Sequence, residues 1–179
     1  MKGLTYRVHK RAPLSQDEAN KLASACKMGL ERLIVWTLLD TGLRVEEFCA
    51  LTPSNILWQE HTLVVYGKNT TGTGGKKRRQ VPMSDRVRPL LEGYFATNDE
   101  IGYTTRHVNR LVHGIANRAR ISQKCSPHVL RHTFAVHSLQ RGVSLPALQK
   151  VLGHEDLKTT AIYLNLSNEE SLREYREKW

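Results

Sequence analysis

Long apolar runs are absent from this 179-residue sequence, and none approaches the ~20 residues that a membrane-spanning helix needs. Residues 1–7 include the basic Lys2 and Arg7 but are followed by no apolar stretch, which argues against a signal peptide. Internal repeats and long low-complexity segments are also missing. We therefore expect a soluble protein with no membrane partner, of a size at which one domain buries roughly 70% of its unfolded surface.

Cysteine is scarce. The three cysteines, Cys26, Cys49 and Cys125, are an odd number, lie far apart and form no C-x-x-C pair. This spacing argues against a disulfide framework and a thiolate zinc site, and it is typical of a reducing compartment. Cys49 stands in the apolar run 48–51, where we expect a small core residue.

Acidic residues are few relative to basic ones. The chain has 27 Lys or Arg against 17 Asp or Glu, a net charge of +10 and a pI near 9.8. Such an excess predicts a polyanionic partner, and nucleic acid is the commonest one. Binding to a membrane surface, or a charged surface that is merely solvated, are the alternatives.

The hydrophobic periodicity predicts an α+β fold that is mainly α-helical, with a small antiparallel β-sheet. A capping box at 15–18 begins the first helix, whereas residues 1–14 lack periodicity and are expected to form an arm or linker. Strands over 62–66 and 79–82, joined by a long basic loop, predict a hairpin. Further helices are expected over 30–39, 45–51, 89–95, 105–119, 127–141, 145–152, 157–164 and 167–179.

The segment 126–134 concentrates polar side chains at the start of a helix, with Ser126 as N-cap and Pro127 as the first helical residue. His128 and Arg131 are three residues apart and therefore share one helix face. An imidazole and a guanidinium beside a helix N-terminus suit a phosphate group. The pattern thus predicts an anion site.

Two other interpretations of this segment stay open. Its polar residues can form an ordinary solvated helix face. Alternatively, His128 and His132 could bind a metal with His137 or His154 as third ligand, but the glutamate of H-E-x-x-H is missing and Arg131 would repel a cation. We expect no metal and no cofactor.

Four further elements accompany this segment: Arg44 after a glycine break, Lys68 at the hairpin tip, His154 at the end of a helix, and Tyr163. Each is weak alone, but their order and spacing resemble the catalytic domain of tyrosine recombinases, the lambda-type integrases and Xer-like recombinases. The resemblance runs from about residue 15 to the C-terminus. The matching stretches are Thr41-Gly42-Leu43-Arg44-Val45-Glu46-Glu47, His128-Val129-Leu130-Arg131-His132-Thr133-Phe134, Leu152-Gly153-His154 and Thr159-Thr160-Ala161-Ile162-Tyr163.

This resemblance implies the fold of the DNA breaking-rejoining enzymes over residues 15–179, and a site-specific DNA recombinase. Such an enzyme cleaves and rejoins strands through a 3′-phosphotyrosyl intermediate without metal or ATP. A type IB topoisomerase and an inactive DNA-binding module are the competing readings. The implied catalytic set is Arg44, Lys68, His128, Arg131, His154 and Tyr163.

The chemistry explains these residue types. Forked guanidinium groups such as Arg44 and Arg131 bind phosphate oxygens and stabilise charge in the transition state. Tyr163 would attack phosphorus, with His128 as base and His154 on the phosphate, and a lysine would protonate the leaving oxygen. The family's tight Gly-Lys-Gly turn is replaced here by an extended loop. Lys68 keeps the expected place after the first strand and is the expected acid, and the extended loop leaves Lys76 or Lys77 as alternatives.

Double-stranded DNA is the expected partner, bound partly through the basic run of Lys76, Lys77, Arg78 and Arg79. The resemblance also implies a tetramer on DNA through the C-terminal segment 167–179, whose apolar stripe could instead pack on its own domain. Members of the family normally carry a helical DNA-clamping domain ahead of this region, so we expect a fragment or a minimal variant. The setting would be a prokaryotic cytoplasm, a virus or a mobile element.

Overall fold

The computed structural model describes residues 12–27, 29–67 and 78–164, and in this part of the chain the predicted α+β architecture is confirmed. Residues 157–164 are also helical. The predicted terminal helix over 167–179 lies outside the described residues. The elements are α1 (Gln16–Ser24), α2 (Leu30–Thr41), α3 (Val45–Cys49), η1 (Pro53–Asn55), β1 (Ile56–Leu57), β2 (Thr62–Tyr66), β3 (Arg78–Pro82), α4 (Arg88–Phe95), α5 (Thr105–Arg118), α6 (Pro127–Gln140) and α7 (Leu145–Leu152).

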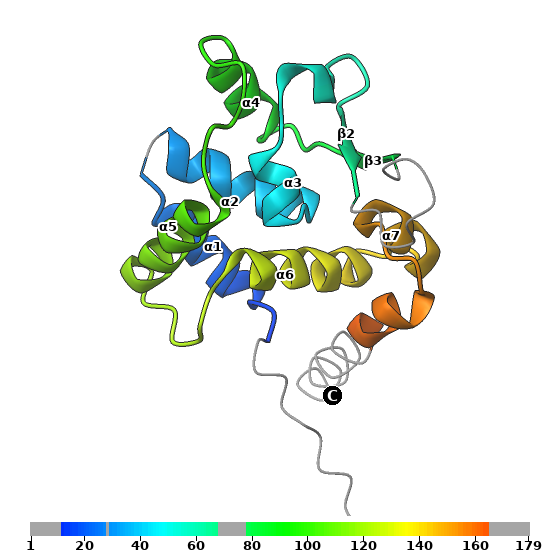
Figure 1. Ribbon diagram of the computed structural model, residues 1–179. Helices are drawn as coiled ribbons and strands as arrows, with labels where there is room; N and C mark the ends of the chain where they lie inside the picture. The colour runs from blue at the N-terminus through cyan, green and yellow to red at the C-terminus, as the bar shows by residue number, and fades with distance from the viewer. Residues whose placement is uncertain (1–11, 28, 68–77, 165–179) are drawn as a thin grey trace, which may run out of the picture.

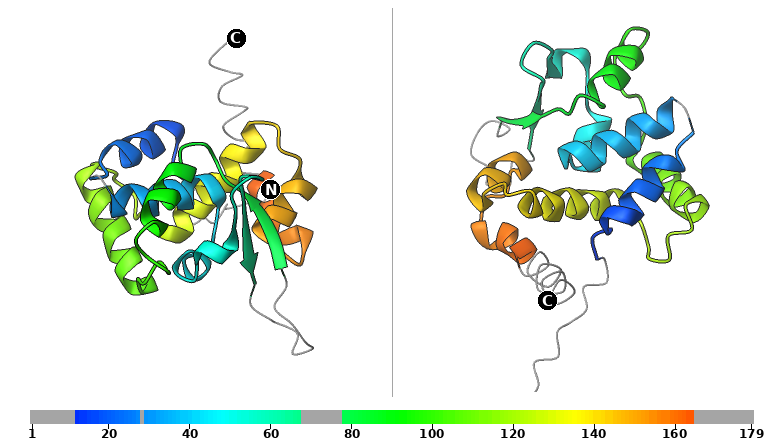
Figure 2. Two further views of the ribbon diagram at one scale, coloured as in Figure 1. Left: turned by 90° about the horizontal axis from the view of Figure 1, so that it is seen from above. Right: turned by 180° about the vertical axis from the view of Figure 1, so that it is seen from behind.

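Helix α6 crosses the middle of the molecule and organises the other elements (Figure 1). Helix α2 packs along it, and α5 packs against both α2 and α6. Figure 2 shows α7 and the helix 157–164 gathered at the C-terminal end of α6, where α7 also contacts β3. This end of α6 therefore brings together elements that are far apart in the sequence.

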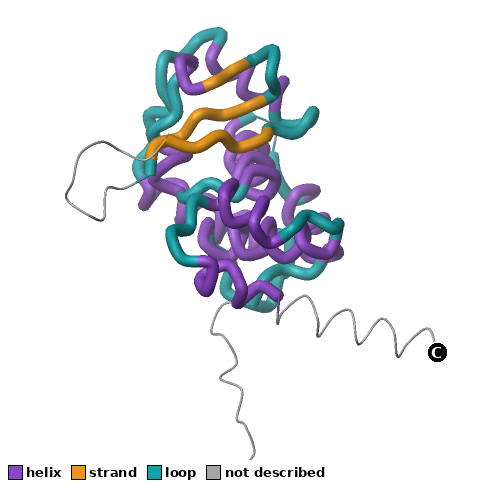
Figure 3. Tube along the Cα trace, turned by 90° about the vertical axis from the view of Figure 1, so that its right-hand side faces the viewer, coloured by secondary structure: helices purple, strands orange, loops and turns teal. Residues whose placement is uncertain are grey.

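The sheet has three antiparallel strands in the order β1-β2-β3 and lies on one side of the helices (Figure 3). The two-residue strand β1 was not predicted, because two residues show no alternation. In the β2–β3 ladder Leu63 pairs with Val81 and Val65 pairs with Arg79. Directly paired residues share a face. The register thus places Arg79 on the same buried face as Val81, and the exposed Arg78 on the other.

The predicted helix starts are confirmed by their caps. Ser15 and Glu18 form the capping box of α1, and Ser126 and Ser144 accept backbone N–H groups at the starts of α6 and α7. The end of the predicted arm over 1–14 is packed in place. Leu14 is buried, and its N–H donates to the Thr133 hydroxyl at 2.8 Å, which ties the chain to α6 before α1 begins.

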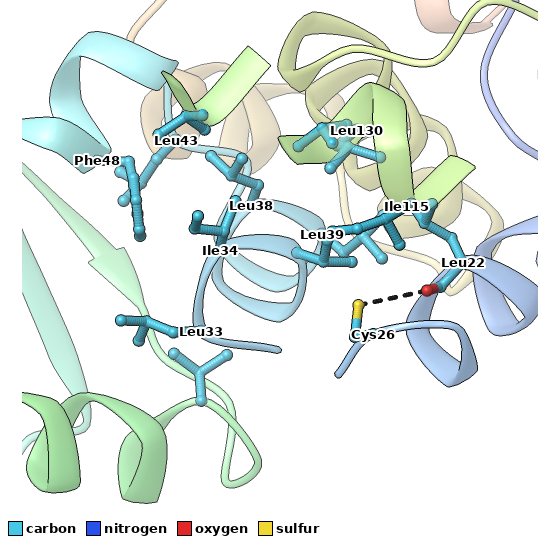
Figure 4. Close-up of a cluster of buried hydrophobic side chains, with 14 of the residues drawn as sticks. Leu22, Cys26, Leu33, Ile34, Leu38, Leu39, Leu43, Phe48, Ile115 and Leu130 are labelled. Carbon is cyan, nitrogen blue, oxygen red and sulfur yellow. Dashed lines mark hydrogen bonds between the residues drawn. The ribbon is translucent and has the colours of Figure 1, made fainter. Parts of the chain in front are cut away.

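The main core lies between α2, α5 and α6, and Figure 4 shows Leu38, Ile115 and Leu130 among its members. The Cys26 thiol donates to the Leu22 carbonyl, and burial raises its pKa to about 11. All three cysteines are free, and Cys49 is partly buried and packs against the main core. A second apolar cluster consists of Ala135 and Val136 on α6 together with Leu148, Leu152 and Tyr163.

Gly42 ends α2 in the left-handed conformation, with φ 61°. A Cβ added there would lie 2.3 Å from Cδ1 of Phe134, closer than any real contact. Glycine is the residue that fits this position, because it tolerates a positive φ and has no Cβ to clash with Phe134. Its carbonyl accepts from Arg131 at 2.6 Å, so this turn also positions a candidate site residue.

Gly42→Ala should destabilise the protein by about 2 to 5 kcal/mol, combining the left-handed penalty with displacement of Phe134. Gly114→Ala is the matched control, because Gly114 is helical and a Cβ there meets nothing within 4 Å. The control should gain about 0.5 to 1 kcal/mol. Urea unfolding measures both, and equal effects of the two substitutions would contradict the role given to the turn.

Candidate active site

Three arginines from three elements converge on the C-terminal end of α7. Arg79 of β3, Arg131 of α6 and Arg44 at the start of α3 donate in that order to the successive carbonyls of residues 151–153, at 2.8, 2.7 and 3.4 Å. These carbonyls have no partner within the helix, and the helix dipole favours positive charge there. One helix end thus orients three guanidinium groups, which we call the arginine cluster.

Glu47 is the carboxylate that neutralises part of this cluster. Arg79 donates to both of its oxygens at 2.6 Å, and Arg44 donates to Oε1 through its side chain and to Oε2 through its backbone N–H. Burial raises the pKa of Glu47, but the contacts with Arg79 and Arg44 outweigh burial and hold the pKa below its ordinary value. The carboxylate is therefore ionised at neutral pH.

Arg131 is the most enclosed member of the cluster, with 5% of its surface exposed. It donates to the carbonyls of Gly42 and Leu152 and contacts Nε2 of His154 at 3.2 Å. Burial, assisted by the charge of Arg44, lowers its pKa to about 10. It remains charged at neutral pH although its protein partners are carbonyls and an imidazole.

His154 follows the left-handed Gly153 that ends α7. Because a guanidinium has no acceptor, Nε2 must accept from Arg131, and Nδ1 then carries the proton and donates to the Thr160 hydroxyl at 2.8 Å. Burial, and after it the charges of Arg131, Arg44 and Arg79, together lower the pKa of His154 to about 4. The imidazole is neutral at physiological pH.

Tyr163 lies on the helix 157–164 and belongs to the second apolar cluster, with Ala135, Val136, Leu148 and Leu152. Its ring stands between two imidazoles, with centroid distances of 5.3 Å to His132 and 6.3 Å to His154. Burial raises its pKa, although Arg131 and Arg44 act to lower it. The phenol is therefore protonated in the free protein.

His128 and His132 form a coupled pair on α6. Their Nε2 atoms are 2.5 Å apart, so one ring donates and the other accepts a single proton. The ring of His132 packs edge-on against Tyr163, a contact that the sequence pattern did not predict. The metal alternative needs three grouped ligands, and the described residues contain no such group.

The structure brings together Arg44, Arg131, His154 and Tyr163 of the predicted catalytic set, and His128 is linked to Tyr163 through the ring of His132. Lys68, Lys76, Lys77 and segment 167–179 lie outside the described residues. Of the predicted DNA-binding run, Arg78 is exposed, but the Arg79 side chain is 9% exposed and its guanidinium faces Glu47.

Glu47 and the placement of Arg79 were missed in the sequence, although signals for both existed. Glu47 stands three residues after Arg44, within side-chain reach on a helix. Arg79 alternates with Val81 along a predicted strand, and a period of two places both on the buried face. The inward placement of Arg79 was missed because a run of four basic residues is typical of an exposed surface.

Residues 13–170 match the model of the phage integrase family. Tyrosine recombinase XerA of Saccharolobus solfataricus is 33% identical over 168 residues, covering 90% of this chain and 55% of that protein. Tyrosine recombinase XerD of Brucella abortus biovar 1 is 35% identical over 178 residues, covering 89% and 55%. The chain spans about half the length of these relatives.

Solved structures agree with these relatives. A crystal structure of XerA recombinase has a TM-score of 0.79 at 33% identity and covers 95% of this chain and 65% of its own. The catalytic domain of bacteriophage HP1 integrase has a TM-score of 0.67 at 27% identity, covering 86% and 87%. In the described ranges no helix is long and apolar enough to cross a bilayer. The chain belongs to the phage integrase family, and the relatives it matches are tyrosine recombinases.

Proposed function

We propose that this chain is the catalytic domain of a site-specific DNA recombinase, with Tyr163 as the nucleophile. The observation that supports this most directly is the convergence of Arg44, Arg131 and His154 next to a buried tyrosine. A phosphodiester bound by the two guanidinium groups would lie close to the phenol. This arrangement matches the needs of phosphoryl transfer, which depends on positioning and on stabilising charge.

The charge of the site suits the change that the reaction makes. Three guanidinium groups against the single Glu47 carboxylate leave a net charge of +2. A phosphodiester carries one negative charge, and the pentacoordinate state formed by attack of an alkoxide-like oxygen carries a second. Since both neutral His154 and protonated Tyr163 add no charge, the cluster is matched to the transition state rather than to the bound substrate.

In the proposed step, the phenolic oxygen of Tyr163 forms a bond to phosphorus and the bond from phosphorus to the 5′ oxygen breaks. The phenol proton passes to His128, and Lys68 protonates the leaving 5′ oxygen. The products are a 3′-phosphotyrosyl linkage and a free 5′ hydroxyl. One phosphoester replaces another of similar energy, so a second 5′ hydroxyl reverses the step without metal or ATP.

Duplex DNA is the proposed partner. Relatives of the same fold were crystallised with DNA, among them XerH recombinase with its difH substrate in a post-cleavage complex. The net charge of +10 favours phosphate contacts, with Lys76, Lys77 and Arg78 as candidates. We further propose assembly into a tetramer on DNA through segment 167–179, in a prokaryotic cell or a mobile element.

Tyr163→Phe should abolish covalent attachment to DNA, because it removes the attacking oxygen and keeps the ring that packs in the second apolar cluster. A nicked suicide duplex is incubated with the chain, and the protein–DNA adduct is measured on a denaturing gel. Tyr94→Phe is the matched control, since its hydroxyl bonds the Ile101 carbonyl far from the site. An adduct from Tyr163→Phe equal to that of the parent would overturn the assignment. Relaxation of supercoiled DNA would instead favour a topoisomerase.

His154 should make stability fall on acidification. Its pKa is about 4 in the folded chain and near the ordinary 6.5 when unfolded, so the unfolded state binds more protons between these values. The advantage of the parent over His154→Gln in urea midpoint should therefore shrink as the pH falls from 7 to 5. Comparison with the variant cancels the contribution of Glu47, which acts in the same direction. A constant gap would show that folding leaves the pKa of the imidazole unshifted, and a gap that grows would show that folding raises it; either result would contradict the lowered pKa.

A further inference from the structure

Arg79 sits within a basic run but is built into the site. Its strand register turns it inward beside Val81, while its neighbour Arg78 is exposed. Its Nε–H donates to the Val151 carbonyl, and its aliphatic stem lies against Gly153, where an added Cβ would be 2.8 Å from Cδ. The guanidinium is therefore held from the sheet side and from α7, in one defined position.

The oxygens of Glu47 are fully used by this arrangement. A carboxylate offers about four acceptor positions. Arg79 takes one on each oxygen, the Arg44 backbone takes one on Oε2, and a single Arg44 side-chain nitrogen takes one on Oε1. Arg44 is thus held by one side-chain bond to the carboxylate and by a long contact of 3.4 Å to the Gly153 carbonyl.

Without Arg79, Glu47 would be a buried carboxylate with Arg44 as its remaining cationic partner among the contacts described. Arginine and carboxylate prefer a two-bond, fork-to-fork geometry. Arg44 would then turn both nitrogens toward Glu47, and the same nitrogens could not meet a phosphate. The competition between two arginines for one carboxylate decides where the Arg44 fork points.

We infer that Arg79 is a positioning residue: by occupying both oxygens of Glu47 it keeps the Arg44 guanidinium available for the scissile phosphate. This inference rests on the proposed function, and it assigns to Arg79 a task other than the DNA-surface contact expected from the basic run. Arg79 itself need not touch DNA.

Arg79→Met removes both the positive charge and the two-bond geometry of the guanidinium, whereas Arg79→Lys keeps the charge and removes only that geometry. Both are assayed in the full chain for the single-turnover rate of adduct formation at saturating duplex, for duplex affinity at several salt concentrations, and for thermal midpoint. We expect Arg79→Met to lose roughly 10- to 100-fold in rate, in the range that misplacement of a reacting group costs. Arg79→Lys should recover only part of this, because an ammonium cannot engage both oxygens. Affinity should change by less than about threefold, since no phosphate contact is lost.

Arg86→Met is the matched control. Arg86 makes a similar two-bond pair with Asp40, and none of the contacts described for this pair involves the arginine cluster. Its loss should lower the thermal midpoint and leave the adduct rate within about twofold of the parent, as expected for an ion pair that acts on stability alone. Arg78→Met is the comparator for a phosphate contact, with weaker affinity and a salt slope reduced by about one.

The double variant Glu47→Gln/Arg79→Met tests whether Arg79 acts through Glu47. If it does, the double variant is within about threefold of the worse single variant rather than the product of the two losses. Multiplied losses would overturn the inference. So would Arg79 variants that behave like Arg78→Met, or an Arg79→Met variant with the parent rate.

A crystal structure of Arg79→Met gives a readout that needs no chemistry. We expect both Glu47 oxygens on the Arg44 side chain, and an unchanged single contact would overturn the inference. If the parent chain forms no adduct, the proposed function is wrong. The contact between Arg44 and Glu47 in the crystal structure of Arg79→Met still decides whether Arg79 positions Arg44. If the parent forms the adduct and the Arg79 variants match it, only the inference about Arg79 fails.

Discussion

The whole site depends on holding three guanidinium groups next to one another with a single carboxylate among them. Two like charges 4 Å apart repel by about 4 kcal/mol at an effective dielectric constant near 20. The protein offsets this repulsion with Glu47 and with the free carbonyls at the end of α7, one for each arginine. A bound phosphate would relieve the remaining repulsion, so the stored positive charge itself favours the anion.

The same cations explain why the two neutral groups of the site stay neutral. They depress the pKa of His154 in the direction that burial already takes it, whereas at Tyr163 they oppose burial and do not overcome it. A phosphate would add negative charge beside the arginine cluster, which Glu47 neutralises only in part. The free chain therefore carries unbalanced positive charge at the arginine cluster, and the negative charge of a bound phosphate would balance it.

Local rules in the sequence predicted most of the fold, because caps and breaks are fixed by single residues such as Ser126 and Ser144. The members of the site could be predicted from the order of their motifs, and the structure shows how they meet. The sequence could not predict which residues the charged side chains of the site contact. Charge composition treats Arg78 and Arg79 alike. Strand alternation could have placed Arg79 on the face of Val81, but its pairing with Glu47, 32 residues earlier, follows only from the packing of the fold. The contact of His132 with Tyr163 likewise depends on how the helix 157–164 packs against α6.

Two left-handed glycines connect the backbone to the electrostatics. Gly42 turns its carbonyl toward Arg131, and Gly153 ends α7 so that its last carbonyls face the arginine cluster. Each turn is closely covered, the first by the Phe134 ring and the second by the stem of Arg79. A side chain at either glycine would displace the residue that covers it, and at Gly153 this is the arginine that occupies Glu47. Backbone conformation and charge placement at this site are thus one constraint, since neither can change without moving the other.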